Sequence, residues 1–258
     1  VQGPPTGIVN KIKLLGDLIN VARIGPKHHD KAPSQEIVHT GDAIDLTKLP
    51  ILKTWPLDGG RYITLPLVIT KDPETNIHNI GMYRMQVFDK KTTGMHWQTQ
   101  KVGRHHQTLE KKNGNSKMEV AVALGGDPAL IWSGSAPVPP DINEYLLSGF
   151  IRNKGVSVTK GITVDLDIPS EAEFIIEGFV DPNESRKEGP FGDHTGYYSI
   201  EDEYPVFHVT AVTHRKNPIY PTIVVGRPPQ EDYWLGKATE RIFLPIMKLT
   251  IPEIIDVH

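Results

Sequence analysis

The segment Tyr62-Ile-Thr-Leu-Pro-Leu-Val-Ile-Thr70 marks the point at which the chain changes character. Residues 27–60 before it are rich in Pro, His, Asp and Gly, and they predict a long connection with a short extended piece around Ile37 and Val38. From Tyr62 onward, β-branched and aromatic residues recur between turn signals, which is typical of β-strands. The segment therefore opens a region that we expect to consist mainly of strands.

The same pattern predicts further strands along the chain. A hairpin connection is expected at Asp89-Lys-Lys-Thr-Thr-Gly94, which joins two of them. Short strands with turn-rich connections predict a β-barrel or sandwich core. The expected strands are 62–70, 79–89, 94–100, 118–124, 156–166, 172–180, 204–214 and 219–225.

Three segments have helical patterns. Apolar residues recur at helical spacing from Ile8 to Ile19, which predicts an amphipathic helix that ends before Gly25-Pro26. A second helix is expected over 144–153, with Asp141 as its N-cap. A third is expected over 231–248, with a kink at Pro245.

Composition narrows the class of protein. The chain has 258 residues, 38% of them hydrophobic and 23% charged, which fits a globular protein. Its net charge of −3 and its scattered basic residues argue against a nucleic-acid partner. The absence of cysteine excludes disulfides, thiolate catalysis and zinc–thiolate sites, and it suits a cytoplasmic location. The chain starts at Val1 and has no signal-peptide pattern, and we expect both ends to be cut from a longer protein.

Glu188-Gly-Pro-Phe-Gly-Asp193-His-Thr-Gly-Tyr-Tyr198 is the segment that says most about chemistry. On a regular strand, Glu188 and Asp193 would point to opposite faces. The intervening glycines and proline favour a turn that folds both carboxylates toward one pocket. One of two such carboxylates tends to stay protonated and can act as an acid. A solvated surface loop is the alternative interpretation.

Three other segments carry candidate binding groups. Asn79-Ile-Gly-Met-Tyr-Arg84 holds an arginine that, if buried, needs an anionic partner; an outward-facing strand arginine is the alternative. Gly94-Met-His-Trp-Gln-Thr-Gln-Lys101 has the mix of groups that a phosphate or flavin requires, although His96 could be purely structural. The Ser/Gly loop at 132–136 leads into a helix start that suits an anion. Glu144 beyond it could bind a divalent cation or simply offset the helix dipole.

Taken together, these segments resemble the UbiD family of reversible decarboxylases. The similarity runs from about Tyr62 to His258 and is most specific at 188–198. It also includes Val122-Ala-Leu-Gly-Gly-Asp-Pro128, Asp165-Leu-Asp-Ile-Pro169 and Gly226-Arg-Pro-Pro229. Within the family, Gly-Asp-His-Thr-Gly-Tyr-Tyr resembles the branch that acts on 4-hydroxy-3-polyprenylbenzoate.

The resemblance implies a mainly β fold with flanking helices (α+β), a split β-barrel of the flavin-reductase type that binds prenylated FMN. By motif position it implies that Arg84, Glu188 and Asp193 are catalytic, with Asp193 or Glu188 delivering the proton. It implies that Asn79 and Glu144 hold Mn²⁺, with K⁺ as a further candidate ion. Some relatives have a histidine as third metal ligand where Lys101 stands here, and a charged lysine can pair with phosphate instead. The implied cofactor contacts are Met82, Tyr83, Arg84, His96, Trp97, Gln98, Lys101, Val102 and Ser135.

The resemblance also implies an organisation and partners. We expect an N-terminal helix and connecting segment at 1–60, the prenylated-FMN-binding barrel at 61–230 and a C-terminal linking helix at 231–258, with a C-terminal domain missing. The expected partners are an aromatic carboxylic acid, a flavin prenyltransferase that supplies the cofactor, and further copies of the chain in a homo-oligomer. Peripheral membrane association is expected if the substrate carries a polyprenyl tail.

Two other functions remain open on the residues alone. An FMN-dependent oxidoreductase could use the same barrel, although it would need no paired carboxylates. A non-catalytic flavin-binding protein would retain the cofactor without exchanging CO₂. Loss of CO₂ from an aromatic acid needs an electron sink that no side chain provides, so the decarboxylase requires its cofactor.

Overall fold

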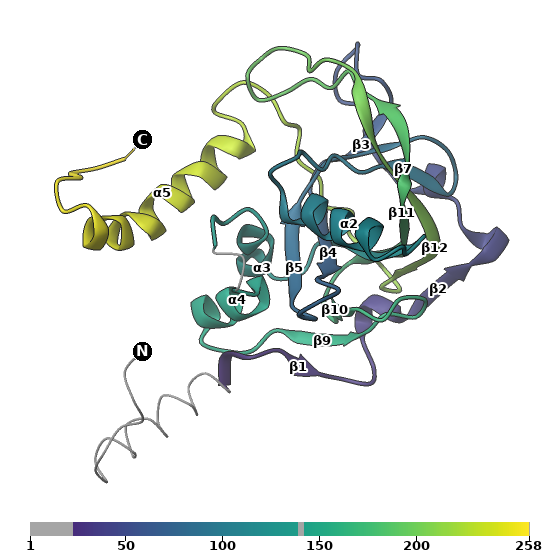
Figure 1. Cartoon of the computed structure of the whole chain (residues 1–258), viewed down its shortest axis with the longest axis horizontal. Coiled ribbons are helices and arrows are strands. Elements are labelled where there is room, and N and C mark those ends of the chain that lie inside the picture. The colour runs from purple at the N-terminus through teal and green to yellow at the C-terminus, as the bar shows by residue number, and fades with distance from the viewer. Residues whose placement is uncertain (1–22, 139–141, 258) are drawn as a thin grey trace, which may run out of the picture.

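The computed structural model describes residues 23–138 and 142–257, and it is dominated by one curled antiparallel sheet (Figure 1). The strand order in this nine-stranded sheet is β3-β6-β7-β12-β11-β8-β4-β5, and β2 pairs with β12. Register shifts in the β11–β12 pair, after Glu177 and after Val180, add twist and let the sheet curl. The strands are β2 (Ile37–Thr40), β3 (Arg61–Ile63), β4 (Leu67–Lys71), β5 (His78–Met82), β6 (Met85–Val87), β7 (Thr92–Gly94), β8 (Met118–Leu124), β11 (Phe174–Glu188) and β12 (Asp202–His214).

A small sheet and the helices surround the large sheet. The small sheet has the order β1-β9-β10, with β1 parallel to β9. Its strands are β1 (Lys27–His28), β9 (Ser157–Lys160) and β10 (Asp167–Pro169). The helices are α2 (Val102–Lys112), α3 (Pro128–Ser133), α4 (Glu144–Arg152) and α5 (Glu231–Thr250), and the 3₁₀ turns are η1 (Pro33–Gln35), η2 (Gly41–Ala43) and η3 (Leu46–Lys48).

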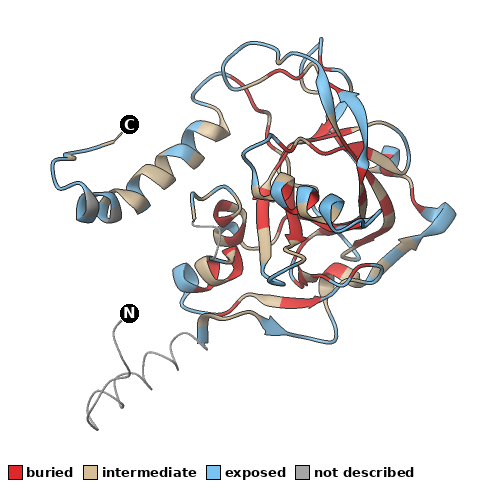
Figure 2. Cartoon of the chain, in the orientation of Figure 1, coloured by how far each residue is buried: buried red, intermediate tan, exposed pale blue. Residues whose placement is uncertain are grey.

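Strand β8 shows why the sheet is buried on both faces (Figure 2). Its alternate residues Val120, Val122 and Leu124 enter the core that the curled sheet encloses. Ala121 and Ala123 enter a second core, which packs beneath α3, α4 and the small sheet. Because successive side chains of a strand point to opposite faces, one nearly uninterrupted apolar run supplies both cores.

The expectation of a mainly β fold with flanking helices is confirmed, although several boundaries differ. The strand expected over 62–70 breaks at Pro66, because proline cannot donate to the ladder. The strand expected over 79–89 breaks at Tyr83 and Arg84, which turn toward a cavity. The hairpin at 89–94 is confirmed by the pairing of β6 with β7.

Other predictions about elements were wrong or lie outside the described residues. The strand expected over 94–100 does not form, because β7 already ends at Gly94. Residues 219–225 form no strand either. Helices α2 and α3 were not predicted. The N-cap of α4 is Asn143, whose side chain accepts the Tyr145 N–H at 2.8 Å, and not Asp141. The helix predicted around Ile8–Ile19 falls on residues that the structure does not describe.

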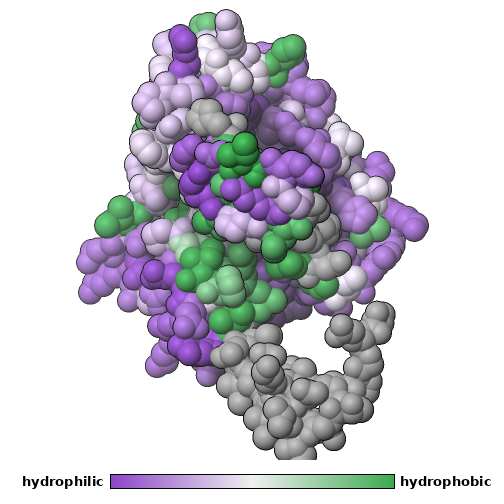
Figure 3. Space-filling view, turned by 90° about the vertical axis from the view of Figure 1, so that its left-hand side faces the viewer, coloured by the Kyte–Doolittle hydropathy of each residue, from purple (hydrophilic) through white to green (hydrophobic). Residues whose placement is uncertain are grey.

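Helix α5 stands apart from the sheet, and apolar side chains gather on the face that carries α4 and α5 (Figures 1 and 3). Phe150 of α4 is 71% exposed, and Trp234 and Leu249 of α5 are 64% and 84% exposed. Exposed apolar area of this kind is a common mark of a contact surface. Within the described ranges, no helix combines the length and the apolar character that crossing a bilayer requires.

Candidate active site

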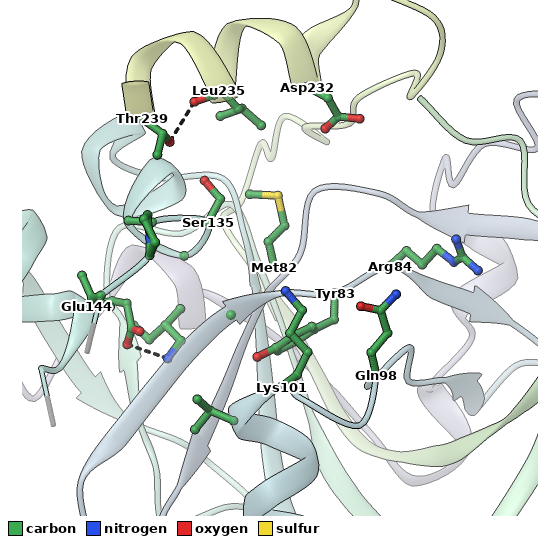
Figure 4. Close-up of a pocket in the computed structure, with 18 of the residues that line it drawn as sticks. Met82, Tyr83, Arg84, Gln98, Lys101, Ser135, Glu144, Asp232, Leu235 and Thr239 are labelled. Carbon is green, nitrogen blue, oxygen red and sulfur yellow. Dashed lines mark hydrogen bonds between the residues drawn. The ribbon is translucent and has the colours of Figure 1, made fainter. Parts of the chain in front are cut away.

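A cavity of about 1170 Å³ lies between helix α5 and the part of the large sheet where β5 leads into β6 (Figure 4). It is large enough for a flavin together with a small aromatic acid. Most residues predicted from the sequence line it, although they come from segments far apart in the chain. These residues are Asn79, Met82, Tyr83, Arg84, His96, Gln98, Lys101, Val102, Ser135, Glu144 and Asp193.

Arg84 is held in a fixed orientation on the cavity wall. Its Nε and Nη2 donate to the two carboxylate oxygens of Glu188 at 2.9 and 3.3 Å, and its Nη2 also donates to Ser199 Oγ at 3.2 Å. The guanidinium stacks over the ring of Phe191, 4.5 Å from its centroid. Arg84 therefore has the anionic partner that burial demands, and the alternative of an outward-facing strand arginine is excluded.

Glu188 lies behind Arg84 with a fully buried side chain and does not itself line the cavity. His96 Nδ1 lies 2.7 Å from its Oε2, and the His96 ring packs on Tyr204 with centroids 4.2 Å apart. Burial alone would raise the pKa of Glu188, but the hydrogen bonds from His96 and Arg84 outweigh it and lower that pKa below the ordinary glutamate value. Glu188 is thus an anion, and the expected protonated member of the carboxylate pair is not Glu188.

The segment after Glu188 turns as the sequence predicted, but it brings only Asp193 to the cavity and not both carboxylates. Asp193 N–H donates to the Tyr197 carbonyl at 3.0 Å, and Gly196 N–H donates to the Asp193 carbonyl at 3.0 Å. An isolated bridge pairs Gly192 with Tyr198 at the base of this turn. The turn brings Asp193 to the cavity and leaves its side chain 31% exposed.

Two residues that the sequence did not single out hold this turn in place. Buried Asp58 accepts the N–H of Gly192 at 2.7 Å and that of Trp55 at 2.8 Å. Gln86 Oε1 accepts the Gly189 N–H at 2.8 Å and the Tyr62 hydroxyl at 3.1 Å. Asp58 lies 134 residues from Gly192, so no local sequence signal connects the two.

Asn79 and Glu144 face the cavity from β5 and the first residue of α4. Glu144 is 5% exposed, accepts the Ile80 N–H at 2.8 Å, and has its pKa raised to about 7 by burial. The Nδ2 of Asn79 is buried without a hydrogen-bond partner in the described chain. A buried carboxylate and a side-chain amide are hard oxygen donors that suit a divalent cation. Residues 23–138 and 142–257 contain no cluster of three or more His, Cys, Asp or Glu that could hold a metal alone.

Lys101 occupies the position before α2 and lines the same cavity (Figure 4). Its ammonium makes no ion pair with any residue that the structure describes. Together with the first N–H groups of α2, it offers positive charge to an anion such as a phosphate. By its chemistry, a charged Lys101 is suited to pair with a phosphate and not to bind a metal.

Trp97 differs from the other predicted cofactor contacts. It is buried in the core, with its ring edge-on to Tyr83 at a centroid distance of 6.4 Å, and it does not line the cavity. A Cβ placed on Gly103 of α2 would lie 2.6 Å from Trp97 Nε1, so the glycine leaves room for the indole. The structure therefore places Trp97 behind Tyr83 as its support.

Helix α5 contributes cavity residues that the sequence did not suggest. Asp232, Leu235 and Thr239 project from it toward the sheet (Figure 4). Burial raises the pKa of the Asp232 carboxyl; the charge of His194 opposes this rise, and those of Asp193 and Glu231 add to it. The spacing of 232, 235 and 239 marks one helix face, but only the fold shows that this face meets the site.

Comparison with known proteins decides the family. Residues 26–228 match the model of the UbiD family, described as a 3-octaprenyl-4-hydroxybenzoate carboxy-lyase Rift-related domain. The chain belongs to the UbiD family. This UbiD-family chain is 54% identical over 254 residues to an uncharacterized protein of Archaeoglobus fulgidus and 53% identical over 255 residues to one of Aquifex aeolicus. Each alignment covers 98% of the chain and 52% of the relative, so the chain spans about half the length of these curated relatives.

Solved structures agree with this family assignment. The UbiD-class enzyme HmfF from Pelotomaculum thermopropionicum, an evolved dimeric form in complex with prFMN, is 30% identical, with a TM-score of 0.82 over 94% of this chain and 58% of that one. The vanillic acid decarboxylase of Sedimentibacter hydroxybenzoicus is 27% identical, with a TM-score of 0.84 over 97% of this chain and 54% of that one. The fold of the UbiD-family chain is therefore that of UbiD-class decarboxylases.

Proposed function

We propose that this protein is a reversible decarboxylase of an aromatic acid that depends on prenylated FMN. The observation that carries the proposal is the buried Arg84–Glu188 pair, whose arginine lines the same flavin-sized cavity as Asp193. A hydride-transferring flavoprotein would need neither the ion pair nor the acid. The substrate proposed is 4-hydroxy-3-polyprenylbenzoate or a similar hydroxybenzoate.

Arg84 and Glu188 divide the work of binding and orientation. Glu188 fixes the guanidinium plane, and the remaining donors of Arg84 can bind the substrate carboxylate. Glu188 and the substrate carboxylate thereby share the positive charge of Arg84, which limits the repulsion between the two carboxylates. Phe191 covers one side of the guanidinium and excludes water from it.

Asp193 is the proposed proton donor. It reaches the cavity, whereas Glu188 is held as an anion behind Arg84. When bound, prenylated FMN supplies the electron sink for the loss of CO₂. The carboxylic acid of Asp193 then gives its proton to the ring carbon that the CO₂ has left.

Asn79, Glu144 and Lys101 are proposed to hold the phosphate end of the cofactor. Asn79 and Glu144 would bind Mn²⁺ through oxygen, with phosphate and water completing its shell, and K⁺ is a further candidate ion. Lys101 would pair with the phosphate directly. Gln98, Val102 and Ser135 line the same cavity.

Assembly and location stay proposals as well. We propose a homo-oligomer, for which the exposed apolar face on α4 and α5 offers area. A cytoplasmic location and peripheral membrane association stay predictions, and no feature of the described residues supports the latter. Because the chain spans about half the length of its curated relatives, the substrate and partners of the whole protein are also proposals.

The test is to co-express the protein with a flavin prenyltransferase and to record absorption and mass spectra of the bound cofactor. Prenylated FMN with manganese, and release of CO₂ from hydroxybenzoates, is the expected result. Plain FMN that a nicotinamide cofactor reduces would overturn the proposal in favour of an oxidoreductase. Prenylated FMN without any CO₂ release or exchange would favour a non-catalytic flavin-binding protein.

A further inference from the structure

Each decarboxylation consumes one proton, and the proposed donor must recover it. The substrate carboxylate leaves as CO₂, its bonding electron pair remains on the ring carbon, and that carbon takes the proton of Asp193. Asp193 is then a carboxylate and cannot serve again until a proton from solvent reaches it. The question is which group passes that proton from water to Asp193.

His194 lies between Asp193 and solvent. Its Nδ1 is 2.9 Å from Asp193 Oδ1, which is hydrogen-bond distance. The His194 side chain is 57% exposed and does not line the cavity, whereas Asp193 is 31% exposed and does. The imidazole therefore contacts water on one side and the proton donor on the other.

Asp232 faces the same pair from the first turn of α5. It lines the cavity with Asp193, and its carboxylate interacts electrostatically with both His194 and Asp193. Two other charged groups lie nearby. Glu231 is next to Asp232 in the chain, and the Arg227 side chain packs against Gly196 in the turn that follows Glu188. His194 thus has Asp193 at hydrogen-bond distance and is close enough to Asp232 for their charges to interact.

We propose that His194 returns a proton from solvent to Asp193 after each turnover, and that Asp232 acts as a positioning residue through its charge. The inference rests on the proposed function of the site. In the step, the imidazolium gives its Nδ1 proton to the Asp193 carboxylate and becomes neutral. Water then returns a proton to the exposed ring, whose rotation is fast compared with typical turnover. The net result is one solvent proton delivered to the ring carbon.

The first test measures turnover of the holoenzyme with His194→Asn, which keeps a polar group near the Nδ1 position but cannot carry a proton. We expect kcat to fall by about tenfold or more, with KM unchanged and with partial recovery in added imidazole. Asp232→Asn should give a smaller fall. His28→Asn is the matched control, because His28 is also 57% exposed and lies 3.7 Å from an aspartate, Asp167, far from the site. Full kcat in His194→Asn, or a loss that imidazole does not recover, would overturn the relay.

The second test does not depend on activity. The carboxyl carbon of Asp232 is followed by NMR as a function of pH in the wild-type protein, His194→Asn and His28→Asn. Removal of the His194 charge should raise the pKa of Asp232, and His28→Asn should leave it unchanged. An unchanged Asp232 titration in His194→Asn would refute the electrostatic interaction between His194 and Asp232 and overturn the role of Asp232. A wild-type protein without decarboxylation would overturn the proposed function, while this titration would still decide whether the two residues interact.

Discussion

At the scale of single residues, the site separates two carboxylates by environment. Glu188 receives hydrogen bonds from Arg84 and His96, which keep it ionised despite complete burial. Asp193, five residues later, has only His194 as a hydrogen-bond partner of its carboxylate in the described chain and reaches the cavity. The same chemical group can therefore serve as a fixed anion in one place and as an acid in the other.

The division of roles predicts the effect of Asp193→Asn. Turnover should fall by at least about 100-fold, because the amide cannot donate a proton as the acid does. Flavin binding should be largely retained, because Asp193 makes no hydrogen bond that holds Arg84 or Glu188. Steady-state kinetics and cofactor occupancy measured by absorbance check both parts. Equal loss of cofactor and turnover would contradict the proton-donor role.

Glu144 predicts a pH-dependent stability. Burial raises its pKa to about 7 in the folded protein, above the value of about 4.5 when exposed, so the folded state binds this proton more tightly. This contribution to stability is fully present below pH 4.5 and is lost as the pH rises through 7. Without metal, Glu144→Gln should therefore stabilise the protein at pH 8 by up to about 3 kcal/mol and have little effect at pH 4.5.

Denaturant unfolding of the metal-free protein at the two pH values measures this difference. Added Mn²⁺ should stabilise the wild type at pH 8, where Glu144 is charged, and should stabilise Glu144→Gln less. Glu253→Gln, at an exposed position, is the control and should change neither result. A Glu144→Gln effect that is the same at both pH values would show that this carboxyl is not desolvated.

At the scale of elements, short breaks in regular structure create the site. The chain leaves β5 after Met82 and re-enters β6 at Met85, which releases Tyr83 and Arg84 from the ladder. Helix α2 begins at Val102 and packs on the sheet at β4, β5 and β11, which brings Lys101 to the cavity and seats Gly103 against Trp97. Tyr83, Arg84 and Lys101 therefore lie just beyond the ends of regular elements and not in their middles.

Two glycines in helices predict opposite stability changes. Gly103→Ala places a methyl group 2.6 Å from Trp97 Nε1, so the buried indole must move, at a cost of about 1–3 kcal/mol. Gly236→Ala in α5 meets nothing within 4 Å and should gain up to about 1 kcal/mol in helix propensity. Thermal unfolding of the cofactor-free protein, with tryptophan fluorescence as the signal, measures both. A neutral Gly103→Ala would argue against a tightly packed Trp97.

At the scale of the whole molecule, the cavity lies between the sheet and α5. Helix α5 stands apart from the sheet (Figure 1). The described contacts that hold α5 include the hydrogen bond from Trp132 Nε1 to Thr239 Oγ1 at 3.3 Å and those from the N–H groups of Val224 and Val225 to Glu231 at 2.9 and 3.3 Å. A cofactor in the cavity would contact both walls and tie α5 to the sheet.

This arrangement predicts that flavin binding protects α5 from proteolysis. In the free protein, limited trypsin digestion should cut first within α5, after Lys237, Arg241 or Lys248, where local opening disrupts few buried contacts. Added FMN should slow these cuts in proportion to the fraction of the protein that has bound it. Cleavage in the core strands should stay slow with and without FMN. Digestion followed by mass spectrometry identifies the sites. Equal rates at α5 with and without FMN would mean that the flavin does not bridge the two walls.

The sequence by itself determined the chemical groups and the class of fold. Alternating apolar and turn-forming segments indicated a mainly β protein, and the resemblance at 188–198 indicated the family, because both are properties of local sequence. The turn after Glu188 was predictable for the same reason, since glycine and proline restrict the backbone wherever they occur. The breaks at Tyr83–Arg84 and the start of α2 were not predictable, because side-chain packing overrides local propensity there.

Only the tertiary structure decided which carboxylate is ionised and what surrounds the other. The pKa of Glu188 depends on Arg84 and His96, which lie 104 and 92 residues away in the chain and meet it only when the sheet curls. Asp58, which fixes the turn after Glu188, and Asp232, which α5 carries to the cavity, likewise reach the site only through the fold. Ionisation and orientation depend on burial and on distances of a few ångströms, and folding sets these distances independently of separation along the sequence.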